Sequence, residues 1–253
     1  MLRRYTCILL LLFLLTGCAA KPQSDDPVKY HQYDLSALGA DEAGFMTYRG
    51  GRYDTGVDVS THQGSINWKA VAADGIDFAM IRVGYRGRET GALNIDRHFA
   101  ANVKGALQNG IKVGVYFYSQ ATTKAEAEEE AYFVLGQIAP YKISYPVAYD
   151  LEMDASPNAR ANSLTSEQRS LFAAAFCNIV QSAGYTPCVY GSASFLADGF
   201  DLLTIQNYPL WVAHYTDRLG VPYDFAMWQY TASGRVDGIN KKADLNICLT
   251  PWG

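Results

Sequence analysis

From residue 56 to the C-terminus, short runs of β-branched and aromatic residues alternate with longer segments whose apolar residues have helical spacing. The pattern predicts strands at 56–60, 78–85, 112–119, 145–152, 186–191, 210–215, 225–231 and 244–249. It predicts helices at 67–73, 97–109, 123–138 and 165–183, and the later strands are separated by short helices or none. Strands that alternate with helices favour βαβ units and a parallel sheet. We therefore predict an α/β fold, a (β/α)8-like barrel with a degenerate C-terminal half.

Two local patterns describe the longer helices. Thr165 and Gln168 have the spacing of a capping box, which indicates that a helix begins there. The helix expected at 123–138 carries a group of acids that we interpret as a solvent-exposed face. These acids are Glu126, Glu128, Glu129 and Glu130.

Two carboxylates end the strand expected at 145–152, namely Asp150 and Glu152. Residues two apart in a strand point to the same face, about 6 to 7 Å apart, so both acids should enter the mouth of the barrel. Like charges at that separation disfavour double ionisation, and one pKa should rise. A carboxylic acid beside a carboxylate is what cleavage of a glycosidic bond requires.

Two further acids and one base lie in expected strands. Asp58 is a charge inside the first strand, and Asp244 opens the last one. The first and last strands are neighbours in a closed barrel, so these two acids are expected to meet. Arg82 lies inside an apolar strand and is interpreted either as a counter-charge for the acids or as a buried ion-pair partner.

Composition excludes several other classes of function. Aromatic residues make up 13% of the chain, which indicates a folded domain, and several rings are available to line a sugar site. The net charge is −4 with no basic stripe, which argues against a nucleic-acid partner. The four His residues show no metal spacing, and no nucleophile elbow, phosphate loop or dinucleotide fingerprint is present. We therefore predict neither a metal nor a cofactor.

The N-terminus has the pattern of a secretory signal. Arg3 and Arg4 precede an apolar run that is shorter than the roughly 20 residues of a membrane span. The run ends in Leu-Thr-Gly-Cys at residues 15–18, which resembles a bacterial lipobox and predicts lipidation of Cys18. We predict a signal peptide over 1–18, a tether over 19–52 and a catalytic domain over 53–253.

Three cysteines then remain in the domain, and an odd number leaves at least one thiol free. A bridge between Cys177 and Cys188 is possible but not indicated, and buried free thiols are the simpler interpretation; Cys248 is the third.

Seven motifs in order from about Tyr53 to the C-terminus resemble family 25 glycoside hydrolases, the N-acetylmuramidase lysozymes. They are Gly56–Ser60 with the following His-Gln-Gly and Ile-Asn-Trp, Phe78–Tyr85, Val115–Tyr118, Tyr149–Glu152, Leu210–Ala213, Met227–Thr231 and Asp244–Asn246. The resemblance covers the whole expected domain. One departure is Asn67, where family members often have Asp.

The resemblance implies a flattened barrel and hydrolysis of the β-1,4 bond between N-acetylmuramic acid and N-acetylglucosamine. It implies that Glu152 is the general acid and that Asp150 assists the substrate's own N-acetyl group, with Asp58 and Asp244 as the other active-site acids. Aromatic subsite residues are expected at Tyr85, Tyr118 and Trp211, and Arg82 is a further candidate for substrate binding.

The expected partners are the glycan strands of peptidoglycan and, through the N-terminal lipid, a membrane; the expected state is a monomer. Two other functions remain open from the residues alone. One is a catalytically silent wall-binding lipoprotein, and the other is a glycosidase for another N-acetylated glycan, such as chitin.

Overall fold

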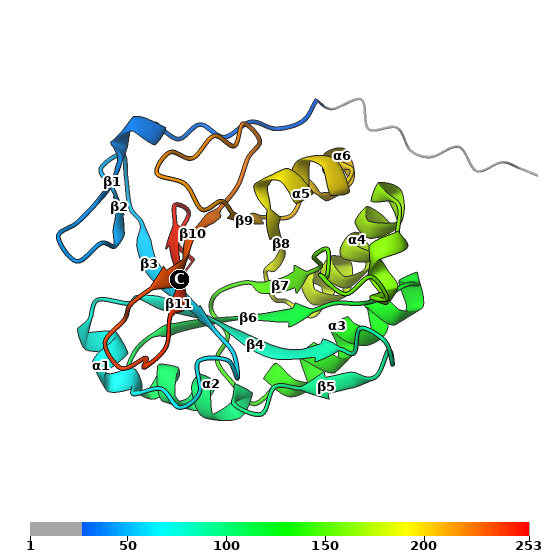
Figure 1. The fold of residues 1–253 in the computed structure, drawn as a ribbon, viewed down its shortest axis with the longest axis horizontal. Helices are drawn as coiled ribbons and strands as arrows, with labels where there is room; N and C mark the ends of the chain where they lie inside the picture. The colour runs from blue at the N-terminus through cyan, green and yellow to red at the C-terminus, as the bar shows by residue number, and fades with distance from the viewer. Residues whose placement is uncertain (1–26, 253) are drawn as a thin grey trace, which may run out of the picture.

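Strands close into a barrel in the computed structural model, which describes residues 27–252. In that part of the chain the barrel has eight strands, and it closes because β3 pairs with both β4 and β11 (Figure 1). The barrel strands are β3 (Asp54–Val59), β4 (Phe78–Arg86), β6 (Lys112–Tyr118), β7 (Val147–Asp150), β8 (Pro187–Ser192), β9 (Leu210–Ala213), β10 (Met227–Gly234) and β11 (Ala243–Cys248). The predicted fold class is confirmed.

The direction of β11 differs from the parallel sheet that the sequence predicts. This strand is antiparallel to both of its neighbours, β10 and β3, whereas β3, β4, β6, β7, β8, β9 and β10 follow one another in parallel. The chain turns directly from β10 into β11 without a crossover helix, and a short connection of this kind permits only an antiparallel pair. The beginning of β11 therefore lies beside the end of β3.

Helices follow the strands of the first half of the barrel, and two short helices follow β8. They are α1 (Trp68–Ala73), α2 (Phe99–Gln108), α3 (Lys124–Ile138), α4 (Ser166–Ser182), α5 (Ala193–Gly199) and α6 (Leu202–Ile205). Asn67, Thr123 and Thr165 cap the first, third and fourth of these, and Thr165 with Gln168 forms the predicted capping box. Short 3-10 turns at Leu35–Ala37 and Arg160–Ser163 and an edge strand, β5 (Leu93–Ile95), complete this part.

Large side chains fill the barrel interior at the end where the parallel strands begin. Phe78 and Tyr145 stack with their ring centroids 4.4 Å apart, and Met80 lies buried in the same cluster. Gly56 on the neighbouring strand has no side chain, and a Cβ there would approach the ring of Phe78 to 2.2 Å. The barrel is thus packed at this end, and Asp58 and Asp150 lie towards the other end.

Residues 27–52 differ from the tether that the sequence predicts over 19–52, of which 19–26 lie outside the described residues. They form an antiparallel hairpin of β1 (Leu38–Ala40) and β2 (Met46–Tyr48), and Phe45 and Tyr48 are buried. The backbone N–H of Met46 donates to the hydroxyl of Tyr230 on β10 at 3.2 Å. No long helix covers the outer face of β10, and this segment covers it instead (Figure 1).

The sequence predicted that the acidic face of α3 is exposed to solvent, but only part of that face is exposed. Glu130 is fully buried, and its carboxylate accepts from Arg86 Nε at 2.8 Å and from Ser119 Oγ at 2.6 Å. Glu126 forms an ion pair with Arg160 at 2.7 Å, and Glu129 reaches Arg86 from the solvent side. Only Glu128 forms an exposed pair within the helix, with Lys124.

In residues 27–252, no helix combines the length and apolar character that a membrane span needs. The predicted signal peptide and lipid site at Cys18 lie outside these residues. Cys177, Cys188 and Cys248 are buried and free, in agreement with the simpler interpretation of the sequence.

Candidate active site

Four carboxyl groups meet at the mouth of the barrel, above its packed interior. Asp150 is the last residue of β7, Glu152 follows two residues later, and Asp58 lies near the end of β3. Asp244 lies at the beginning of β11, which is the same edge because this strand runs antiparallel. The structure therefore brings together the four acids that the sequence singles out, at the barrel end where such folds carry their active sites.

Asp150 and Glu152 lie close enough for the charge of Glu152 to act on Asp150. Two buried carboxyl groups that lie together do not both ionise readily. Burial, followed by the charge of Glu152, raises the pKa of Asp150 well above its ordinary value. Burial also raises the pKa of Glu152, although its interaction with Asp150 partly offsets this effect. The pair thus retains a proton at a pH where exposed carboxyl groups are ionised.

Asp58 and Asp244 are directly opposite each other in the β3–β11 ladder. Burial and then the charge of Asp244 raise the pKa of Asp58 well above its ordinary value. Burial raises the pKa of Asp244 as well. The sequence predicts this meeting correctly, but it depends on the antiparallel direction of β11: a parallel last strand would place its first residue at the opposite end of the barrel.

Two side-chain amides donate to Asp58. Gln229 Nε2 and Asn246 Nδ2 both reach Asp58 Oδ2, at 2.8 and 2.9 Å. These two residues face each other in the β10–β11 ladder, and both are buried. Their hydrogen bonds favour the ionised form of Asp58 and oppose the effects that raise its pKa.

Arg82 is an ion-pair partner, and its charge also opposes the rise in the pKa of Asp150, so both interpretations left open by the sequence apply. Its Nε and Nη2 atoms contact Asp96 Oδ2 at 2.9 and 2.8 Å, and its side chain is 13% exposed. The guanidinium also lies 5.6 Å from the ring centroid of Tyr85, which is 37% exposed. Both residues belong to β4, and the exposed ring of Tyr85 is accessible to a ligand, whereas most of Arg82 is engaged by the protein.

Tyr118 and Trp211 differ in their accessibility. Tyr118 is partly exposed at the end of β6, and its hydroxyl donates to Asp154 Oδ2 at 3.0 Å. Trp211 is only 1% exposed, and its Nε1 donates to Asn246 Oδ1 at 2.8 Å. Because its ring is covered by Tyr116 and Tyr190, Trp211 offers no face on which a sugar could stack. Its expected place among the aromatic subsite residues is therefore wrong for this structure.

Sequence analysis missed several polar residues of the mouth, among them Gln229, Asn246, Tyr190 and Tyr215. The period of two along each strand could have found most of them: Gln229 alternates with the buried outer residues Trp228 and Tyr230, and so must point inward. Tyr215 follows β9 in a loop, where periodicity gives no signal.

A cavity of about 400 Å³ opens beside Glu152. Its lining comes from the segment after β7 and from α5, and includes Met153, Phe195 and Asp198. The volume and the partly apolar lining are within the range of small-ligand sites. Within residues 27–252, no three His, Cys, Asp or Glu side chains are arranged to hold a metal ion.

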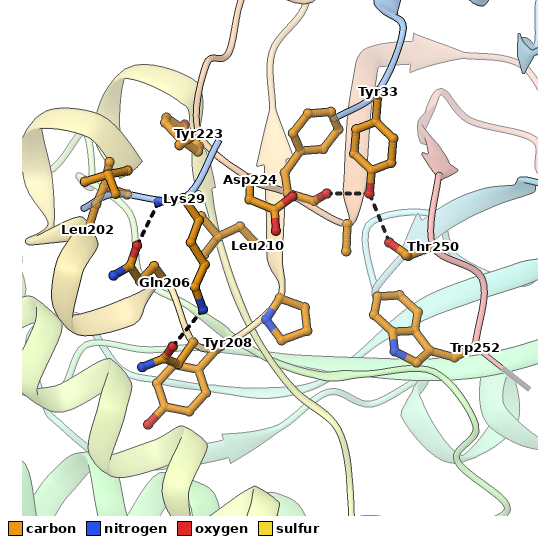
Figure 2. Close-up of a pocket in the computed structure, with 15 residues that line it drawn as sticks. Lys29, Tyr33, Leu202, Gln206, Tyr208, Leu210, Tyr223, Asp224, Thr250 and Trp252 are labelled. Atoms are coloured by element: carbon orange, nitrogen blue, oxygen red, sulfur yellow. Dashed lines mark hydrogen bonds between the residues drawn. The ribbon is translucent and has the colours of Figure 1, made fainter. Parts of the chain in front are cut away.

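A second cavity, of about 350 Å³, lies at the opposite end of the barrel (Figure 2). It lies between the N-terminal segment and the beginnings of β9 and β10. Lys29 Nζ contacts Asn207 Oδ1 at 3.0 Å, and the hydroxyl of Tyr33 donates to the carbonyl of Phe225 at 2.9 Å. These contacts join the N-terminal segment to the barrel, and the four acids take no part in this cavity.

Known proteins resemble this chain in both sequence and fold. The model of the glycosyl hydrolases family 25 matches residues 57–239. The autolytic lysozyme of Clostridium acetobutylicum is 26% identical over 192 residues, which cover 76% of this chain and 54% of that protein. This chain thus spans about half the length of that curated relative.

Two solved structures show the same architecture. The modular autolysin LytC from Streptococcus pneumoniae superposes with a TM-score of 0.70 at 26% identity, over 90% of this chain and 52% of that one. The lysozyme from Streptomyces coelicolor superposes with a TM-score of 0.61 at 26% identity, over 76% of this chain and 90% of that one. With the family model matching most of the barrel, the chain belongs to glycosyl hydrolase family 25.

Proposed function

We propose that this protein is an N-acetylmuramidase, which hydrolyses the β-1,4 bond between N-acetylmuramic acid and N-acetylglucosamine in peptidoglycan. The observation that carries the proposal is the pair of acids at the end of β7, Asp150 and Glu152, which lie at the mouth of the barrel where burial raises the pKa of both. A retained proton is what the leaving sugar requires at the pH of the cell envelope.

In the proposed reaction, Glu152 is the residue that protonates the glycosidic oxygen. It is partly exposed and borders the cavity, whereas Asp150 is only 3% exposed at the end of β7. As the bond to the leaving sugar breaks, the acetamido oxygen of the substrate bonds to C1 and forms a cyclic oxazolinium ion. Water then attacks C1, the ring opens to regenerate the acetamido group, and Glu152 takes the proton of the water.

Asp150 is better suited to assist the acetamido group than to attack the sugar. Asp150 is only 3% exposed, and its Oδ1 has no hydrogen-bond partner in the described chain, so it offers an acceptor to the acetamido N–H. When Glu152 carries the proton of the pair, Asp150 is free to accept a hydrogen bond from the acetamido N–H. This exchange of one proton between two acids gives each a separate role.

The names of the relatives support the substrate class. The matched protein from Clostridium acetobutylicum is an autolytic lysozyme. The autolysin LytC has been solved in complex with a synthetic peptidoglycan ligand, and 90% of this chain superposes on it with a TM-score of 0.70.

The test is digestion of purified peptidoglycan, followed by mass spectrometry of the new reducing ends. We expect reducing N-acetylmuramic acid in the products. Reducing N-acetylglucosamine would contradict the proposed bond, and cleavage of chitin alone would move the substrate to another N-acetylated glycan. Binding to peptidoglycan without any release would instead identify a catalytically silent wall-binding protein.

We also propose that the protein is exported and is anchored to a membrane of the cell envelope through lipid on Cys18. The Leu-Thr-Gly-Cys pattern at residues 15–18 supports this proposal. The anchored domain would act on peptidoglycan close to that membrane.

Membrane fractionation tests the anchor. We expect the wild-type protein to be labelled by a radioactive fatty acid and to sediment with membranes, and Cys18→Ala to lose the label. A labelled Cys18→Ala protein would place the lipid elsewhere, and an unlabelled wild type would contradict the anchor. Size-exclusion chromatography of the detergent-free domain should give the mass of a monomer.

A further inference from the structure

The orientation of Asp58 is fixed by two side-chain amides that donate to the same carboxylate oxygen. Gln229 and Asn246 both donate to Oδ2, and no residue of the described chain donates a hydrogen bond to Oδ1. Hydrogen bonds to one oxygen from two different strands restrict rotation of the carboxylate. Asp58 therefore presents Oδ1 as its available acceptor.

The two amides are themselves held in one orientation. Trp211 Nε1, which can only donate, contacts Asn246 Oδ1, so the amide nitrogen of Asn246 must face Asp58. The carbonyl oxygen of Gln229 accepts from the hydroxyl of Tyr190 at 2.9 Å and from the hydroxyl of Tyr215 at 2.8 Å. These contacts leave the nitrogen of Gln229 to donate to Asp58.

Tyr215 is the solvent-facing end of this network. Its ring is 56% exposed, whereas Tyr190, Trp211, Gln229 and Asn246 are all buried. Burial, followed by the charges of Asp244 and Asp58, raises the pKa of Tyr215 to about 12, so its hydroxyl remains a donor near these acids. An exposed aromatic ring beside the acids, held in place by its hydroxyl, can bind a sugar face with little loss of side-chain entropy.

We propose that Tyr215 is a sugar-binding residue of this site, and that Gln229 is a positioning residue which connects its hydroxyl to Asp58. A sugar that packs on the ring restricts Tyr215 to the conformation in which it donates to Gln229. Binding of the substrate and orientation of Asp58 are thereby coupled. The inference deepens the proposed muramidase activity and rests on it.

The ring and the hydroxyl of Tyr215 can be tested separately by steady-state kinetics on purified peptidoglycan fragments. Tyr215→Ala removes both, and we expect KM to rise about fivefold to tenfold, as for the loss of an aromatic contact. Tyr215→Phe retains the ring, so KM should stay within about twofold, while kcat falls about threefold to tenfold with the lost hydrogen bond. Equal KM values for wild type and Tyr215→Ala would overturn sugar binding by this residue.

The positioning role of Gln229 requires a readout that a purely structural role would leave unchanged. Gln229→Met keeps the approximate shape but removes the amide, and we expect kcat to fall about tenfold or more with KM little changed. Because the amide opposes the rise in the pKa of Asp58, its loss should move the acidic limb of the pH profile of kcat/KM to higher pH. The titratable groups that interact with Asp58 are Asp150, Glu152, Asp244, Tyr116, Tyr190 and Tyr215.

Matched controls separate the possible outcomes. Tyr132 is 65% exposed on the outer helix α3, and Tyr132→Ala should leave both KM and kcat unchanged. A lower kcat in Gln229→Met without a shift of the acidic limb would overturn the positioning role. If the wild-type protein releases no fragments from any N-acetylated glycan, the proposed function fails. If the wild type is active and the Tyr215 variants are unaffected, only the proposed role of Tyr215 is contradicted.

Discussion

The two halves of the barrel are supported from outside in different ways. Helices α1 to α4 follow the strands from β3 to β7, whereas no helix longer than seven residues follows β8 to β11 in the described chain (Figure 1). The outer apolar residues of β10, Trp228 and Tyr230, are nevertheless buried. The hairpin formed by residues 27–52 covers them. A barrel can thus lose its helices on one side if another segment excludes water from the same strands.

The two halves also supply different parts of the site. The helix-covered half supplies Asp150 and Glu152, whose pKa values are both raised by burial. The half with few helices supplies Asp244 and the two amides that hold Asp58, which itself lies on β3 where the halves meet. We infer that the helix-covered half provides the proton of the reaction and that the other half fixes the orientation of the Asp58 carboxylate.

The largest effect on stability is expected in the helix-covered half, at the buried ion pair between Arg86 and Glu130. Glu130→Ala removes the buried carboxylate partner of Arg86 and leaves only the exposed Glu129, and loss of a buried partner costs about 3 to 5 kcal/mol. Urea unfolding should show the decrease in the free energy of unfolding. The control is Glu128→Ala on the same helix, which breaks only an exposed pair and should cost less than about 1 kcal/mol. Equal effects would mean that the buried pair does not support this half.

A somewhat smaller effect is expected in the other half, at the hairpin that replaces the helices. Phe45→Ala removes a ring that is 7% exposed, and large-to-small changes in a core cost about 3 kcal/mol. Tyr30→Ala, at a position 62% exposed in the same segment, should change the free energy of unfolding by less than about 0.5 kcal/mol. If both variants are as stable as the wild type, residues 27–52 act as a linker and not as a cover.

The smallest expected effect on the free energy of unfolding is an increase rather than a decrease. The pKa of Asp150 is raised in the folded protein, so its ionisation opposes folding as the pH rises above the ordinary value of the carboxyl group. Asp150→Asn should therefore increase stability at neutral pH by about 1 kcal/mol while activity falls. The gain should shrink as the pH is lowered, because the wild-type carboxyl group is then protonated in both states. A gain that does not depend on pH would exclude titration of Asp150 as its cause.

The comparison of the two halves also shows how far the sequence predicts this molecule. Expected strand and helix bounds lie within a few residues of those observed, because caps such as Thr165 and the β-branched runs are local signals. The direction of β11 is not local, since a strand pattern reads the same in both directions. Asp150 and Glu152 were found because they end an expected strand, whereas Asp58 was found as a charge inside a strand and Asp244 as an acid that opens one.

The errors have a common physical origin, which is that tertiary partners decide burial. Trp211 and Glu130 were both expected to be accessible, but both are buried against partners, Asn246 and Arg86, that lie on strands distant in the sequence. Residues 27–52 lack a periodic apolar pattern, yet two of their aromatic residues fill the gap left by missing helices. Helix-poor regions of a predicted barrel are therefore places to search for a covering segment elsewhere in the chain.

The most direct test of the account is the turnover of peptidoglycan by Glu152→Gln, measured beside the wild type and Asp58→Asn. The amide keeps the shape of the side chain but cannot supply the proton, so kcat should fall at least about 100-fold in Glu152→Gln. Asp58→Asn should also reduce kcat, and both variants should keep the circular dichroism spectrum of the wild type. Near-normal turnover by a folded Glu152→Gln would contradict the assignment of the proton donor and with it the account of the site.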